Sequence, residues 1–80
     1  MGMEVKRRLG LSPQQRGSMS NANCPDIFEL RDGTFAIIGT DRTAELEGAL
    51  PEGASRADDE RIIVITRETL VCAKHDIPDR

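Results

Sequence analysis

Aromatic residues are scarce in this chain of 80 residues, which contains no Trp, no Tyr and only two Phe. Single-stranded nucleic acids bind proteins largely by stacking their bases on aromatic side chains. The composition therefore disfavours that mode of binding. The core has to be built from Ile, Leu, Val and Ala, because these are the apolar residues that the chain has in number.

Long apolar runs are also missing. A helix that spans a bilayer needs roughly 20 consecutive apolar residues, and a secretory signal needs a continuous apolar stretch of about 7 to 15 residues. Neither pattern occurs in the sequence. We therefore expect a cytoplasmic protein that does not bind membranes.

Cysteine is limited to Cys24 and Cys72, and in a cytoplasmic chain both are expected to be reduced thiols. Cys72 and His75 are three residues apart on a predicted helix, so with Cys24 they are the candidate ligands of a zinc ion or the groups of a thiol site. Structural zinc normally recruits two close pairs of ligands, and the sequence has no glycine-rich phosphate loop. The sequence therefore favours no metal, no cofactor and no enzymatic activity.

Charge divides the chain into two parts. Residues 1–18 contain four basic residues and one acidic residue, for a net charge of +3, whereas residues 19–80 contain seven basic and thirteen acidic residues, for a net charge of −6. The acidic part repels nucleic-acid phosphates. Nucleic-acid binding, an alternative function, would therefore use the basic residues of the N-terminal arm. These are Lys6, Arg7, Arg8 and Arg16.

The first 18 residues show little strand or helix periodicity and are interrupted by glycine and proline. Gly17-Ser18 is typical of a cloning junction, and Met19 resembles a second, natural start. We therefore interpret residues 1–18 as a flexible basic leader or a cloning remnant, and residues 19–80 as a single small domain.

The strongest local pattern is an Asp-Gly dipeptide at 32–33 between two apolar segments, which predicts a β-hairpin with a two-residue type I′ turn. In that register Leu30 lies opposite Phe35, and Phe28 lies opposite Ile37. Side chains alternate between the two faces of a sheet, so these four apolar residues would share one face. We predict that this face is the interaction face of the protein.

Two helices and one more strand follow the hairpin. Thr40 or Asp41 is positioned to cap a short helix that ends before Pro51. Residues 61–66 are apolar on both faces, which indicates a central strand. The predicted fold class is α+β, a small ββαβα domain whose three-stranded sheet has the N-terminal β-hairpin and carries the two short helices on one face.

The second predicted helix spans residues 67–75 and begins at Thr66, whose hydroxyl can cap the free amides of its first turn. The spacing of Leu70, Ala73 and Ile77 places these three side chains on one side of the helix. We expect that side to face the core.

Three segments resemble a family of small uncharacterised actinobacterial proteins. They are Cys-Pro-Asp-Ile-Phe-Glu-Leu at 24–30, Asp-Gly-Thr-Phe-Ala-Ile-Ile-Gly-Thr-Asp at 32–41 and Glu-Arg-Ile-Ile-Val-Ile-Thr-Arg-Glu-Thr-Leu at 60–70. The resemblance spans nearly all of residues 22–78. Members of that family are often encoded near helix-turn-helix regulators, so the resemblance implies a regulatory partner. It implies no activity and no site residues.

A three-stranded sheet of this size has two free edges and one thinly covered face, which favours pairing with another chain. We therefore predict a protein-binding accessory or regulatory module that partners a transcriptional regulator. Self-association through the sheet remains open, and nucleic-acid binding and a thiol or zinc site are the alternative functions.

Overall fold

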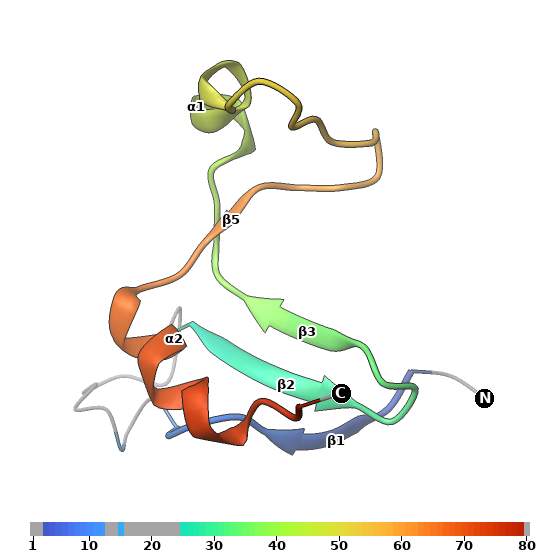
Figure 1. Ribbon diagram of the computed structural model, residues 1–80, viewed down its shortest axis with the longest axis vertical. Coiled ribbons are helices and arrows are strands. Elements are labelled where there is room, and N and C mark those ends of the chain that lie inside the picture. The colour runs from blue at the N-terminus through green and yellow to red at the C-terminus, as the bar shows by residue number, and fades with distance from the viewer. Residues whose placement is uncertain (1–2, 13–14, 16–24, 80) are drawn as a thin grey trace.

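The computed structural model describes residues 3–12, 15 and 25–79. Its central element is a three-stranded antiparallel sheet in the order β1-β2-β3 (Figure 1). The strands are β1 (Val5–Arg8), β2 (Asp26–Leu30) and β3 (Phe35–Ile38). The predicted α+β class is confirmed, although the third strand is β1 and not residues 61–66.

The turn that joins β2 to β3 has three residues and not two. The Leu30 N–H donates to the Thr34 carbonyl oxygen at 2.9 Å, and the Gly33 N–H donates to the Leu30 carbonyl oxygen at 3.1 Å. Gly33 has a φ of +92°. A three-residue hairpin loop with glycine in the left-handed conformation has this geometry. Asp32 therefore lies inside a longer loop than the Asp-Gly pattern predicts.

The extra loop residue makes the predicted register wrong by one residue. Ile37 lies opposite Ile27, and the other pairs of this hairpin shift in the same way. Opposed side chains share a face of the sheet. The predicted interaction face is therefore divided between the two sides, with Phe35 and Ile37 on the same side as Ile27, and Phe28 and Leu30 on the opposite side.

Strand β1 comes from the segment that was predicted to be a leader. Val5 lies opposite Leu30 and Arg8 opposite Phe28, with a β-bulge between Val5 and Arg7. The prediction of a flexible leader is therefore wrong for these residues. The bulge interrupts the alternation of polar and apolar side chains by which strands are recognised. Residues 17–19, the predicted junction and second start, lie outside the described residues.

Helix α2 (Arg67–Ala73) and the 3₁₀ turn η2 (Lys74–Asp76) lie against the three-stranded sheet (Figure 1). The Thr66 side chain accepts a hydrogen bond from the Thr69 N–H, which confirms the predicted N-cap. The residues that the helix buries are Thr69 and Ala73, whereas Leu70 and Ile77 are about half exposed. The predicted inward face is therefore rotated, because Ala73 and not Leu70 fits the close contact with the sheet.

The core is small. Leu9, Ile27 and Ala73 form the buried apolar cluster, and Ile65 packs against it. Leu9, the residue that directly follows β1, is only 2% exposed, so the chain enters the core at the end of this strand.

A second sheet of two short strands projects from the first (Figure 1). Its strands are β4 (Thr40–Asp41) and β5 (Ile63–Val64), and its far end carries α1 (Thr43–Leu46) and the 3₁₀ turn η1 (Glu47–Ala49). We call residues 40–64 the arm. The short helix before Pro51 is confirmed, but α1 does not share the face that α2 covers.

The prediction of a central strand at residues 61–66 is wrong. Only Ile63 and Val64 are in a strand, and their side chains are 39% and 42% exposed. In the described part of the chain the arm is a ribbon of two strands with no third strand beside it. An apolar sequence alone does not distinguish such a ribbon from a buried strand.

Candidate binding surface

The outer edge of β3 is unpaired among the described residues, because the sheet order ends at this strand (Figure 1). Backbone groups of an antiparallel strand point alternately toward and away from its neighbour. Leu30 and Thr34 form a hydrogen-bonded pair. The alternation from that pair directs the backbone N–H and C=O groups of Phe35 and Ile37 away from β2. This edge therefore offers hydrogen-bonding groups to another strand.

The side chains of β3 make the same edge apolar. Phe35, Ile37 and Ile38 are 44%, 51% and 54% exposed. The strand contains no charged residue and no proline, which are the usual devices that keep a free edge from pairing. An edge of this kind is a site at which another strand can add to the sheet.

An open hollow of about 660 Å³ lies beyond the end of β3, where the chain enters the arm. Its lining contains apolar residues and two threonines and no charged residue. The lining residues are Pro25, Ile38, Gly39, Thr40, Val64, Ile65 and Thr66. Because Ile38 belongs to both features, the hollow continues the apolar surface of β3.

Gly39 allows the close approach of the two segments that line this hollow. An ideal Cβ at Gly39 would lie 2.5 Å from Ile63 Cγ2 and 2.6 Å from the Val64 carbonyl oxygen. Both distances are shorter than van der Waals contact. Any larger residue at position 39 would therefore push β5 away and change the shape of the hollow.

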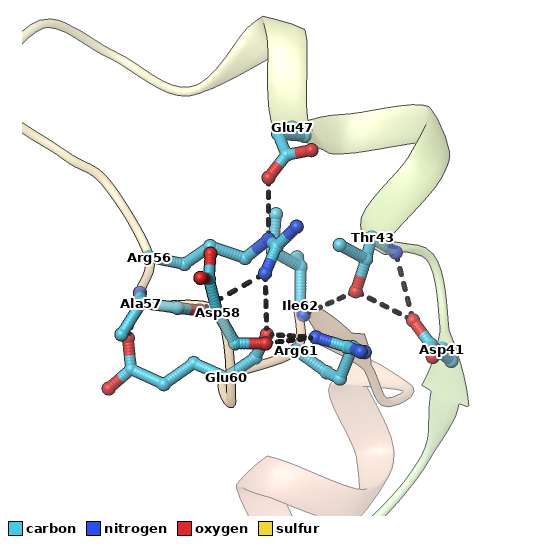
Figure 2. A network of polar contacts seen from close by, with 9 residues as sticks. All are labelled: Asp41, Thr43, Glu47, Arg56, Ala57, Asp58, Glu60, Arg61 and Ile62. Atoms are coloured by element: carbon cyan, nitrogen blue, oxygen red, sulfur yellow. Dashed lines mark hydrogen bonds and ion pairs between the residues drawn. The ribbon is translucent and has the colours of Figure 1, made fainter.

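The arm is held by polar contacts at its far end (Figure 2). The Thr43 hydroxyl donates to the Asp41 carboxylate at 2.7 Å and accepts from the Ile62 N–H at 2.8 Å. Arg56 forms an ion pair with Glu47. These contacts join both segments of the arm, so we assign them a structural role.

Two exposed carboxylates have a lowered pKa. Hydrogen bonds from the Thr34 hydroxyl and then the Thr34 N–H hold the pKa of Asp32 below its ordinary value of 3.8. Hydrogen bonds from the Thr43 hydroxyl and then the Thr43 N–H lower the pKa of Asp41 in the same way. Both carboxylates stabilise local turns through these hydrogen bonds.

The candidate thiol or zinc residues are not brought together by the described residues. Cys24 lies outside them, Cys72 is a half-buried free thiol on α2, and His75 is exposed on η2. The described part of the chain contains no group of three or more His, Cys, Asp or Glu side chains that could hold a metal ion. This alternative therefore stays an untested prediction.

The basic N-terminal residues have acidic partners. Arg7 Nε lies 2.9 Å from Glu29 Oε1, and Arg8 Nε lies 3.0 Å from Asp26 Oδ1. Lys6 is exposed, and Arg16 lies outside the described residues. Two of the four predicted nucleic-acid contacts are thus engaged within the protein.

The acidic partners of these arginines, Asp26 and Glu29, were missed by the sequence analysis. Both are buried. A signal was present, because a buried strand rarely contains carboxylates unless they are paired with basic residues. The position of two acids in an otherwise apolar strand therefore indicated a basic segment nearby.

No family model matches this chain, and no curated protein or solved structure is significantly similar to it. The resemblance to the actinobacterial family therefore stays a prediction. In the described residues no helix is long and apolar enough to cross a bilayer.

Proposed function

We propose that this protein is a protein-binding accessory module that adds a strand of its partner to the free edge of β3. The observation that carries the proposal is the outward backbone of Phe35 and Ile37 beside exposed apolar side chains, with no charge or proline along the strand. Addition of a partner strand to a sheet edge is a common mode of peptide recognition.

The hollow at the end of β3 supports specificity in this mode of binding. Main-chain hydrogen bonds along an edge supply affinity for any extended segment, whereas a pocket for a side chain selects among sequences. The residues that line the hollow are apolar or uncharged, and they include Thr40 and Thr66. It suits an uncharged side chain at one end of the partner strand.

A transcriptional regulator is the partner that we propose, on the basis of the resemblance to proteins encoded near helix-turn-helix regulators. Direct nucleic-acid binding receives less support, because Arg7 and Arg8 are held in ion pairs with Glu29 and Asp26. A partner protein would then contact the nucleic acid, and this chain would act on the partner.

The experiment is affinity capture from lysate of the source organism with the full chain, the Ile37→Lys variant and the Val71→Lys variant as baits. Both substituted residues are exposed apolar side chains, but Val71 is on α2 and away from the edge. We expect the full chain and Val71→Lys to retain one specific protein in the presence of nuclease. Ile37→Lys should lose it, because a lysine at this position opposes edge pairing.

Circular dichroism of both variants is the control, since each should keep the spectrum of the full chain. Equal capture by a folded Ile37→Lys variant would contradict the proposal. Capture that disappears with nuclease would favour nucleic-acid association instead. Sedimentation equilibrium of the full chain and Ile37→Lys separates a partner protein from self-association through β3, because only the latter makes the mass of the full chain rise more steeply with concentration than the mass of the variant.

A further inference from the structure

The two adjacent arginines of β1 lie on opposite faces of the sheet. The β-bulge before Arg7 sets it opposite Glu29, and Arg8 lies opposite Phe28. Arg7 Nε lies 2.9 Å from Glu29 Oε1, and Arg7 Nη2 donates to the Asp76 carbonyl oxygen at 2.7 Å. Arg7 therefore joins β2 to the C-terminal end of the α2 and η2 segment.

Arg8 makes an equally specific contact on the other face. Its Nε lies 3.0 and 3.1 Å from the two carboxylate oxygens of Asp26, and its guanidinium lies 5.5 Å from the centre of the Phe28 ring. The side chains of Asp26 and Glu29 are only 7% and 11% exposed. A strand without the arginines would leave two buried carboxylates unpaired, which is strongly unfavourable.

The next two residues are also fixed by their surroundings. Leu9 is buried with Ile27 and Ala73, and its N–H donates to the Ile27 carbonyl oxygen at 2.9 Å. The Gly10 N–H donates to Asp76 Oδ2 at 2.7 Å.

Gly10 cannot be replaced without strain. It has a φ of +82°, and an ideal Cβ would lie 2.8 Å from the Cys72 carbonyl carbon. Both observations exclude a side chain at this position. The surroundings of residues 7–10 thus fit each residue separately, in the order Arg, Arg, Leu and Gly.

The connection to β2 does not impose this pairing. Antiparallel neighbours are commonly joined by two to about five residues, whereas β1 ends at Arg8 and β2 begins at Asp26. A connection of this length is not a tight turn, so turn geometry does not fix the register of β1 against β2. The contacts of residues 7–10 are the same whether the strand comes from the same chain or from another copy.

We propose that β2, α2 and η2 form an acceptor site for an extended Arg-Arg-Leu-Gly segment, and that a second copy of this chain fills it by exchange of residues 3–12. The site supplies a carboxylate on each face for the two arginines, an apolar position for the leucine and a backbone contact that admits only glycine. It is separate from the β3 edge, so it stands whether or not β3 binds a partner.

The first test uses the full chain with Arg7→Glu and Arg8→Glu, which disables its own strand and leaves the acceptor site intact. A fluorescent synthetic peptide of residues 3–12 is titrated into it and followed by anisotropy. The matched control is the same peptide with Gly10→Ala, which has the same length and charge. We expect saturable binding of the first peptide and binding weaker by about tenfold or more for the control.

The substituted chain can lose its fold when its strand is disabled, so circular dichroism accompanies the titration. In that case the residue 3–12 peptide should restore the native spectrum, and the Gly10→Ala peptide should do so only at about tenfold higher concentration. Equal effects of the two peptides would overturn the proposal. Failure of the first peptide both to bind and to restore the spectrum would also overturn it.

The second test measures exchange between copies directly. The Arg7→Glu, Arg8→Glu chain is mixed with a chain that carries Asp26→Arg and Glu29→Arg. Within each chain the strand and the site then repel, whereas between the two chains the charges are complementary. We expect a 1:1 heterodimer by native mass spectrometry and sedimentation. Two species that stay monomeric in the mixture would contradict exchange, even if the peptide binds.

Discussion

The sheet with α2 and the arm are stabilised by different interactions. In the first region apolar side chains are buried between β2 and α2, and two buried carboxylates are paired with arginines. In the arm, neither α1 nor η1 buries a residue, and polar contacts hold the two segments together (Figure 2). A typical intramolecular hydrogen bond contributes only about 0.5 to 1.5 kcal/mol to stability. We therefore expect the arm to open before the sheet unfolds.

Leu9→Ala is expected to have the largest effect, because it removes the core residue that directly follows β1. Loss of a buried leucine side chain typically costs about 2 to 5 kcal/mol. Urea denaturation measures the loss in the free energy of unfolding. Val71→Ala, at an exposed position of α2, is the control and should change that free energy by about 0.5 kcal/mol or less. Similar losses for both would show that Leu9 is not part of the core.

Arg8→Ala is the next test, because it leaves the buried Asp26 carboxylate without its ion pair. We expect a loss of about 1 to 3 kcal/mol in the free energy of unfolding. The comparison is Arg42→Ala, which breaks the exposed ion pair with Glu45 in the arm. Exposed pairs contribute about 1 kcal/mol or less. Equal losses in chemical denaturation would remove the distinction between the two regions.

Gly39→Ala is expected to disturb the arm and spare the sheet, because the added methyl group would overlap Ile63 and Val64. Hydrogen exchange should show about tenfold or greater acceleration for the Arg42 N–H, which donates to the Ile62 carbonyl oxygen. The Leu9 N–H in the sheet should keep its protection. Gly48→Ala is the control, because an added Cβ there meets nothing within 4 Å. Acceleration in the sheet as large as in the arm would contradict this separation.

The smallest expected effect is a loosening of the arm at acidic pH. The hydrogen bonds from Thr43 lower the pKa of Asp41 in the folded state, so ionisation of Asp41 favours the folded arm above the unfolded pKa. This contribution is lost as the pH falls through the folded pKa, which lies below 3.8. Amide chemical shifts of residues 41–43 should report it. Asp41→Asn should abolish the change there and leave the change at Asp32 intact.

Local sequence patterns predicted the hairpin and the helices better than they predicted how these elements pack. The Asp-Gly dipeptide predicted the hairpin, and Thr66 marked the start of α2, because turn and cap residues act on their immediate neighbours. The register failed because Asp-Gly also fits a loop of three residues, in which only Gly33 needs the left-handed conformation. A difference of one residue then divided the predicted interaction face between two sides of the sheet.

The candidate sites, like the packing of the elements, could be predicted from the sequence only in part. The apolar, uncharged sequence of β3 was visible, but its role as a free edge depends on which strand takes the other side of β2. Residues 5–8 contain three basic residues and a β-bulge, so no alternation marked them as a strand. The pairing of Arg7 with Glu29 joins residues far apart in the sequence, and spacing gives no information on such contacts.

The sequence by itself determined the α+β class, the presence of the hairpin and of two short helices, and the start of α2 at Thr66, since these depend on turn residues, caps and short-range apolar spacing. Only the tertiary structure decided that β1 and not residues 61–66 completes the sheet. The physical reason is that Arg7, Arg8 and Leu9 satisfy two buried carboxylates and fill the core, whereas Ile63 and Val64 pair only with β4.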